Sequence, residues 1–484
     1  MKFNWTIILK ILGILLVFNA AFILTTIPFT LFDGYRDLEP LLWSAAISLV
    51  PGGLLFFLTR KSENNDLGKK DGFLIVTLGW FFLTVFGTVP FLLTGAIPNP
   101  ADAFFEAMSG YTATGATILD DIESKSLGIL YWRNLTQWIG GLGMIVLAVA
   151  ILPLLGVGGM QLFVAEAPGI SPEKLQPRIK ETAKRLWFIY LGLTALQTLV
   201  TWICGMSFFD ALTHAFTTMA SGGFSPKQDS LAFYSPLLQY IVIVFMFLAG
   251  TNFTMIYLGM HGQFVKAWTN EEFRYYLGIV FVVSMTVGLS IYFMGHGTLE
   301  KSLRDGFFQV ISILTTTGYA TYDYTSWSPF ITVVFFLLMF HGASAGSTAG
   351  GMKLVRHVLF LKNGWMEFKR QIHRSAIIPV RYNGKAVSQD IIYNVLAFVI
   401  IYISIFAAGS AFVAGFGVDF ETALGATAAC LGNVGPGIGS VGPADTFSHL
   451  PDPTKWFLSF LMLIGRLELF TVLLLFTPFF WRKN

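Results

Sequence analysis

Thr112-Ala113-Thr114-Gly115 is the first of four short turns that organise this sequence. The other three are Ala220-Ser221-Gly222-Gly223, Thr315-Thr316-Thr317-Gly318 and Gly432-Asn433-Val434-Gly435. Each turn ends in glycine, follows a short amphipathic stretch and lies between two long hydrophobic stretches. Four copies of one layout in a single chain predict a pore with four-fold pseudosymmetry.

The composition is that of a polytopic membrane protein. Hydrophobic residues make up 54% of the chain, charged residues only 12%, and the mean hydropathy is +0.66. A soluble domain carries about 25% charged residues, so the composition excludes a water-soluble fold. The two cysteines, Cys204 and Cys430, lie in apolar sequence and predict no disulfide framework.

Ten segments are long and apolar enough to cross a membrane, which takes about 20 residues. The first is too long for the core of a signal peptide and is expected to be retained as a span. The eighth contains a run of small residues, Gly342–Gly351, and is expected to be interrupted. The segments are residues 6–29, 39–59, 72–94, 132–155, 186–204, 236–260, 274–295, 328–362, 390–416 and 454–480.

Four shorter segments, each too short to cross, lie between these spans and end at the four turns. A carboxylate near a helix N-terminus is favoured by the helix dipole, and each segment has one. We therefore expect four half-helices that stop inside the membrane and that line a cavity or lie buried in protein. The segments are residues 101–111, 208–219, 303–315 and 420–431, with Asp102, Asp210, Asp305 and Glu421 near their starts.

The predicted organisation is an all-α membrane protein with a two-span N-terminal segment followed by four units of span, half-helix, turn and span. Basic residues gather in Lys174–Arg185 and Lys353–Lys385, and acidic residues gather in the loops on the other side. The positive-inside rule then predicts cytoplasmic termini and outward-facing turns. The N-terminal segment covers residues 1–70, and the units cover residues 71–160, 161–265, 266–375 and 376–484.

The chemistry of the turns indicates a filter for a dehydrated cation. Backbone carbonyl oxygens can replace the water around a potassium ion when they point at one axis. Glycine permits the backbone dihedral angles that this requires. One such turn would be an ordinary loop, but four in matching positions favour a filter that binds potassium through its carbonyls. The candidate filter residues are Thr112, Ala113, Thr114, Gly115, Ser221, Gly222, Gly223, Thr316, Thr317, Gly318, Asn433, Val434 and Gly435.

Around these turns the sequence resembles the Trk/Ktr/HKT superfamily of potassium transporters. The two-span N-terminal segment favours the bacterial Trk type over the shorter Ktr type. Some plant members that transport sodium carry serine in place of the first filter glycine, so Gly115 favours potassium and rubidium. Tyr111 and Ala113 depart from the threonine- or phenylalanine-like residues that are commoner there. The stretches that carry the resemblance are Ala113-Thr114-Gly115-Ala116-Thr117, Gly222-Gly223-Phe224-Ser225, Thr315-Thr316-Thr317-Gly318-Tyr319 and Asn433-Val434-Gly435-Pro436-Gly437.

The resemblance implies further properties. The protein would lie in the bacterial inner (cytoplasmic) membrane, in contact with lipid, as a homodimer above a cytoplasmic ring of nucleotide-binding regulatory subunits. The ring would bind the nucleotide, so this chain would need no cofactor, and no nucleic-acid partner is expected. The basic inner connections are a candidate docking surface for the ring, although the positive-inside rule and anionic lipid explain the same charge.

Two features predict a gate. Glycine costs about 1 kcal/mol in a helix relative to alanine, so the glycine run is expected to form a loop within the eighth span, where the resemblance implies a gate. Arg466 lies about halfway along the last span, where a charge is costly and usually faces a cavity. It would repel a resting cation or bind the loop through carbonyls. The candidate gate residues are Gly342, Ser344, Gly346, Ser347, Thr348, Gly350, Gly351 and Arg466.

Each of these hypotheses has an alternative. Small residues also allow close helix packing, and Arg466 could form a structural ion pair, for which Glu468 is badly placed. A symporter for an organic solute would need a midplane site between broken helices. An enzyme would need clustered carboxylates or an activated nucleophile, which do not stand out. The sequence leaves open whether cation flux is channel-like or coupled to protons or sodium.

Overall fold

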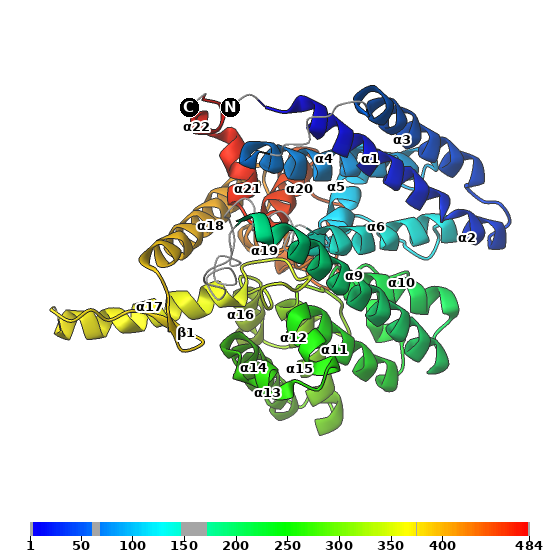
Figure 1. Ribbon diagram of the computed structural model, residues 1–484. Coiled ribbons are helices and arrows are strands. Elements are labelled where there is room, and N and C mark those ends of the chain that lie inside the picture. The colour runs from blue at the N-terminus through cyan, green and yellow to red at the C-terminus, as the bar shows by residue number, and fades with distance from the viewer. Residues whose placement is uncertain (1–2, 61–67, 147–171, 374, 483–484) are drawn as a thin grey trace.

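The computed structural model describes residues 3–60, 68–146, 172–373 and 375–482 (Figure 1). Helices dominate these residues, as predicted. The only β structure among them is a short hairpin of β1 (Arg381–Tyr382) and β2 (Lys385–Ala386). Figure 1 shows a bundle of helices from which one helix, α17 (Leu354–Ile372), projects to the side.

The N-terminal segment is a pair of long helices joined by a short one. α1 (Trp5–Leu24), α2 (Ile27–Phe32) and α3 (Leu38–Thr59) follow one another, and α1 also packs against the first repeated unit. The two long helices approach closely at Gly13 and Gly52, where a Cβ atom on Gly13 would lie 2.8 Å from the Gly52 carbonyl oxygen. Small residues at a crossing are typical of helix pairs in membranes.

The rest of the bundle repeats one layout four times. In each unit a long helix leads to a half-helix, a turn and a second helix, as the sequence predicts. The units are α4 (Lys69–Leu93), α5 (Pro100–Tyr111) and α6 (Leu127–Val146); α9 (Pro172–Ile203), α10 (Phe208–Met219) and α11 (Pro236–Gly250); α14 (Glu271–Phe293), α15 (Leu299–Leu314) and α16 (Pro329–Leu338); and α18 (Gln389–Gly415), α19 (Phe420–Gly432) and α20 (Asp452–Arg466).

The half-helices begin with matching caps. A side-chain oxygen of the residue before each helix accepts a hydrogen bond from a backbone N–H of the first turn, which satisfies a donor that the helix leaves free. These residues are Asn99, Ser207, Thr298 and Asp419. Backbone and side-chain bonds from Thr422 hold the pKa of the Asp419 carboxyl below its usual value.

One of the acidic residues expected near a half-helix start lies further along. α15 begins at Leu299, so its first-turn carboxylate is Glu300, and Asp305 lies in the second turn. There Asp305 is buried and accepts a hydrogen bond from Thr321 at 3.3 Å. The prediction placed the helix start too late because Lys301 and Arg304 interrupt the apolar pattern.

Six helices of the described residues have the length and hydropathy of a membrane span, or eight if each of two bent pairs counts as one span. The fourth predicted span, 132–155, runs past residue 146 and so lies partly outside the described residues. The eighth is the short helix α16 followed by a loop, so the predicted interruption is confirmed.

Two spans that were predicted to be continuous are broken. The predicted span 236–260 bends by 109° between α11 and α12 (Phe253–Met260), where Asn252 caps the new helix. The predicted span 454–480 bends by 112° between α20 and the pair α21 (Phe470–Leu473) and η5 (Leu474–Phe476). At this corner Glu468 and Leu469 take left-handed φ values of 59° and 51°. The prediction missed both breaks because each has only a single glycine beside it, Gly250 or Gly465, and no proline. The remaining elements are η2 (Ser230–Phe233), α13 (Phe264–Thr269), η3 (Tyr324–Ser326), η4 (Gly439–Val441) and α22 (Pro478–Trp481).

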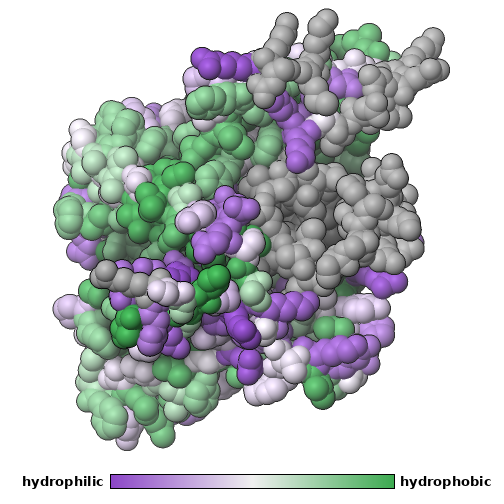
Figure 2. All heavy atoms as spheres, turned by 60° about the vertical axis from the view of Figure 1, so that its left-hand side comes forward, coloured by the Kyte–Doolittle hydropathy of each residue, from purple (hydrophilic) through white to green (hydrophobic). Residues whose placement is uncertain are grey.

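The outer surface carries many exposed apolar side chains. Figure 2 shows them covering broad areas of the face that it draws, with hydrophilic side chains gathered in separate zones. A soluble monomer rarely exposes apolar patches larger than a few hundred Å², whereas lipid solvates such a surface. Clear examples on α3, α14 and α18 are Trp43, Val50, Phe57, Phe281, Val282, Ile400, Ile403 and Phe412.

Candidate ion pathway

The four turns share one backbone conformation. In each, a left-handed residue follows the half-helix, and a glycine of positive φ comes two residues later. The N–H after the left-handed residue bonds back into the helix, as Thr114 does to the Ser109 carbonyl at 2.8 Å. This is the Schellman ending of a helix, in which glycine is the usual left-handed residue. Here the left-handed residues are Ala113, Ser221, Thr316 and Asn433, with φ of 49°, 55°, 56° and 52°.

The turns meet in a closed ring. A Cβ atom built on the last glycine of each turn would come within 3.0 Å of the carbonyl oxygen that precedes the last glycine of the next turn. The fourth turn returns to the first, so the chain closes a circle of backbone contacts with no room for side chains at the glycines. In order, the glycine and carbonyl partners are Gly115 and Gly222, Gly223 and Thr317, Gly318 and Val434, and Gly435 and Thr114.

A cavity opens over this ring. Its lining includes the last glycine of every turn, and a single cavity bordered by all four must lie on their common axis. Thr117, Arg133 and Lys227 contribute polar atoms to its wall. The glycines are Gly115, Gly223, Gly318 and Gly435.

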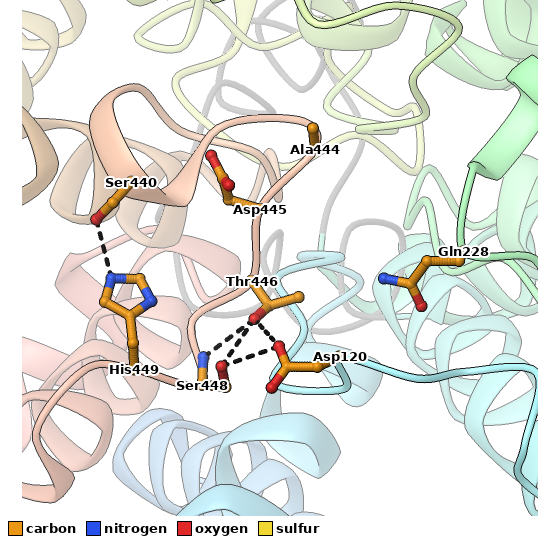
Figure 3. Close-up of a pocket in the computed structure, with 8 residues that line it drawn as sticks. All are labelled: Asp120, Gln228, Ser440, Ala444, Asp445, Thr446, Ser448 and His449. Atoms are coloured by element: carbon orange, nitrogen blue, oxygen red, sulfur yellow. Dashed lines mark hydrogen bonds between the residues drawn. The ribbon is translucent and has the colours of Figure 1, made fainter.

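A second cavity of about 390 Å³ adjoins the first and shares Gln228 and Asp445 with it (Figure 3). Figure 3 shows Asp120 held by the hydroxyls of Thr446 and Ser448, the latter at 2.9 Å. Two carboxylates, Asp120 and Asp445, thus stand at the entrance to the ring and favour cations there.

On the other side of the ring, the glycine-rich stretch between α16 and α17 forms a loop rather than the closely packed helix of the alternative hypothesis. Thr348 lies 3.0 Å from Ser221, hydroxyl to hydroxyl, and the Gly350 N–H donates to the Thr316 hydroxyl at 2.7 Å. A Cβ atom on Gly350 would lie 2.6 Å from the Asn433 Cβ. The loop therefore touches the left-handed residues of the second, third and fourth turns.

The loop contains all the predicted gate residues except Arg466, and other helices hold it in place. The Ala345 N–H donates to Glu272 of α14 at 2.7 Å, and the Ser344 N–H donates to the Gly250 carbonyl at 3.1 Å. Glu272 was missed in the sequence because a carboxylate at the start of a span looks like an ordinary helix-end residue. The predicted residues in the loop are Gly342, Ser344, Gly346, Ser347, Thr348, Gly350 and Gly351.

Arg466 ends α20 with only 1% of its surface exposed. Its guanidinium donates to the Thr348 carbonyl at 2.8 Å and to the Gly140 carbonyl at 3.2 Å. Among the described residues no carboxylate pairs with it, so the alternative of a structural ion pair is wrong for this part of the chain. Glu468 pairs instead with Arg356 of α17, in a buried contact.

The buried polar groups of α6 were also missed. Arg133 pairs with Glu106 of α5 at 2.6 Å and donates to the Ser225 carbonyl at 3.0 Å. One helical turn further, Gln137 donates to the Gly222 carbonyl at 2.7 Å and accepts from the Phe224 N–H at 3.0 Å. Glu106 lies 27 residues away in the same unit and the other partners belong to the second unit, so no local sequence pattern points to them.

Comparison with known proteins shows which family has this arrangement. Residues 42–483 match the model of the TrkH family, which is described as a cation transport protein. The chain belongs to the TrkH family. The Trk system potassium uptake protein TrkH of Escherichia coli K12 is 40% identical over 443 residues, which cover 90% of this chain and 91% of that protein.

Two further TrkH relatives match almost from end to end. The Trk system potassium uptake protein TrkH of Halomonas elongata is 39% identical over 493 residues, 98% of this chain and 99% of that one. The crystal structure of the potassium transporter TrkH from Vibrio parahaemolyticus is 36% identical, with a TM-score of 0.90, and covers 99% of this chain and 100% of its own. The predicted fold class, a multi-pass helical membrane protein of the Trk type, is thereby confirmed.

Proposed function

We propose that this TrkH-family chain is the ion-conducting subunit of a potassium uptake system and that it passes potassium and rubidium in preference to sodium. The observation that carries the proposal is the closed ring of four turns beneath a cavity that all four last glycines line. The names of the E. coli and V. parahaemolyticus relatives support potassium as the ion.

The ion would enter through the acidic outer cavities and lose its water at the ring. The four carbonyl oxygens that precede the last glycines would replace that water. They belong to Thr114, Gly222, Thr317 and Val434. A negative cell interior would drive the ion inward with about 2.3 kcal/mol per charge for each 100 mV.

The loop between α16 and α17, together with Arg466, would form the gate. In the contacts described above, the loop lies against three of the four turns, and Arg466 joins it to the first unit through the Gly140 carbonyl. Opening would require the loop to leave Ser221 and Thr316 and the positive charge of Arg466 to move from the path.

The membrane location, the oligomeric state and the partners that we propose are those expected for the family. The protein would lie in the bacterial inner membrane with both termini cytoplasmic, as a homodimer above a ring of nucleotide-binding regulatory subunits, and would not be an enzyme or bind a cofactor itself. Phe3 and Trp481 lie with ring centroids 5.4 Å apart, which supports termini on one side. The projecting α17 exposes Trp365 and Phe368, and these apolar side chains could be buried against a second copy of the chain in a dimer.

The test is ion flux in liposomes that contain the purified protein. Wild type is expected to pass potassium and rubidium well above sodium. Gly115→Ser is expected to lower that preference about tenfold or more, because a side chain at φ 87° would strike the Gly222 carbonyl. Gly278→Ala on α14, where a Cβ atom meets nothing within 4 Å, is the matched control.

The same liposomes distinguish the channel-like reading from symport. With no proton or sodium gradient, a membrane potential alone should drive potassium through a channel-like pore. Flux that needs one of those gradients would establish the proton- or sodium-coupled alternative. A folded wild type that passes sodium as readily as potassium would overturn the proposal.

A further inference from the structure

The second turn lacks a side chain that the other three possess. The residue before the last glycine is Thr114, Thr317 or Val434 in three turns, but Gly222 in the second. Gly222 is not among the residues of positive φ, so its backbone would accept a side chain. A Cβ atom there would instead strike the amide group of Gln137. The space is therefore occupied by a side chain from another unit.

Gln137 fits this space with both ends of its amide bonded. Its Nε2 donates to the Gly222 carbonyl at 2.7 Å, its Oε1 accepts from the Phe224 N–H at 3.0 Å, and it is fully buried. One helical turn earlier, Arg133 donates to the Ser225 carbonyl. On the other side of Gln137, Gly141 packs against Ala220. One face of α6 thus follows the second turn from its beginning to its end.

The other turns are braced by their own side chains. In the first turn, the hydroxyls of Thr112 and Thr114 lie 2.8 Å apart, and those of Thr315 and Thr317 in the third turn lie equally close. In the fourth turn, the Asn433 amide donates to the Met462 carbonyl and to the Thr114 hydroxyl of the first turn, both at 2.9 Å. Each turn therefore has a brace, and among these braces only that of the second turn is a side chain from outside the four turns.

We propose that Gln137 is a positioning residue that sets the ion selectivity of the filter by fixing the Gly222 carbonyl. This inference rests on the proposed function. The Gly222 oxygen abuts Gly115 and so contributes to the closed ring, and among the described residues it is the one ring carbonyl that accepts a side-chain hydrogen bond. A bound amide stops this oxygen from turning inward around an ion smaller than potassium.

The test measures the potassium-to-sodium permeability ratio of the full chain in liposomes. Gln137→Leu keeps the approximate size of the side chain and removes both hydrogen bonds. The Gly222 carbonyl and the Phe224 N–H then remain buried without partners, which is unfavourable. The permeability ratio is therefore expected to fall about tenfold, the change that corresponds to about 1.4 kcal/mol. Asn134→Leu is the matched control. Asn134 is a buried amide on the same helix whose Nδ2 bonds only to the Leu130 carbonyl.

A rescue distinguishes positioning from general stability. Gly222→Thr alone is expected to displace the Gln137 amide and to lower the ratio. Gly222→Thr combined with Gln137→Ala gives the second turn the residue that Thr317 supplies in the third, and the ratio is expected to return to within about threefold of wild type. Size-exclusion elution and thermal unfolding show which variants fold.

Two results would overturn the inference. One is a folded Gln137→Leu protein whose potassium-to-sodium permeability ratio equals that of wild type or falls no further than the ratio of Asn134→Leu. The other is a folded double variant that is no more selective than its single parents, which decides the matter even if Gln137→Leu fails to fold. A wild type that does not prefer potassium is a failure of the proposed function instead, since it does not involve Gln137.

Discussion

At the scale of single residues, the left-handed positions divide the four turns into two kinds. Ser221, Thr316 and Asn433 carry polar side chains, and the loop between α16 and α17 contacts all three. Ala113 has no polar group to offer, and it is in the first unit that Arg466 binds a carbonyl, that of Gly140. The arginine therefore connects the loop, through the Thr348 carbonyl, to a helix of the first unit.

Arg466→Ala is expected to increase rubidium flux by about tenfold, because it removes a buried positive charge and the contact with the Thr348 carbonyl together. A barrier lowered by about 1.4 kcal/mol gives a change of that size. Tracer uptake into liposomes measures it, with Arg60→Ala, an exposed arginine at the end of α3, as the control. Unchanged flux in a folded Arg466→Ala protein would remove Arg466 from the gate.

At the scale of elements, the second helix is broken in three units, and the sequence predicted only one of the breaks. The glycines between α16 and α17 weaken a helix by composition, which is a local signal. The corner at Glu468 and Leu469 has no glycine run, only the single Gly465 before it. There the buried pair of Glu468 with Arg356 of a distant helix helps to hold the left-handed backbone.

The half-helices and the residues of the turns could be predicted because their causes are local. Caps, apolar periodicity and glycine spacing are all visible within a dozen residues. The supports of the turns could not be predicted, because Glu272 and Gln137 bind partners from other units or far along the chain. The partners of Arg466 were equally hidden, since they are carbonyl groups and every residue has one.

The corner at Glu468 gives a stability prediction. Arg356→Met keeps much of the side-chain volume over the Phe398 ring but leaves the Glu468 carboxylate buried and unpaired, which is expected to cost about 3–5 kcal/mol. Thermal unfolding in detergent checks it. The control is Glu367→Gln, which removes the charge of an exposed carboxylate paired with Arg370 and should cost at most about 1 kcal/mol. Adding Glu468→Gln to Arg356→Met should recover part of the loss.

The loop between α16 and α17 gives a prediction for activity: a substitution that displaces the loop should increase ion flux. Gly350→Ala is compatible with the backbone, which has no positive φ there, but its methyl group would press on Asn433 and push the loop from the fourth turn. Rubidium flux is expected to rise by at least about threefold, since a contact that favours the closed loop is lost. Gly364→Ala on α17, which meets nothing within 4 Å, is the control. Lower flux in folded protein would mean that the loop contact holds the pathway open.

At the scale of the whole molecule, four units of different sequence produce one ring of matching backbone. The ring tolerates the differences because its contacts are between glycine Cα atoms and carbonyl oxygens, which every unit supplies. Side chains vary behind it: paired threonines in two turns, an asparagine in one, and a glutamine from a neighbour in the other.

The electrostatic field over the ring also acts at the scale of the whole molecule. Asp445 lines both cavities over the ring. Asp445→Asn is expected to raise the apparent KM for potassium by about two- to threefold at low ionic strength and less at high salt, because its charge concentrates cations and salt screens it. Uptake measured against potassium concentration tests this. Asp390→Asn at the start of α18 is the control, and an equal effect in both variants would contradict a local origin.

The contact of Gly435 with the Thr114 carbonyl joins the last turn to the first and completes the circle. A ribosome must therefore translate almost the whole chain before the fourth set of oxygens exists. A product that stalls earlier has three sides of a ring and no enclosed path lined by oxygens. Building the pore from one polypeptide, rather than from four copies of a short one, thus spares a cell the leakage of its ion gradients through half-made molecules.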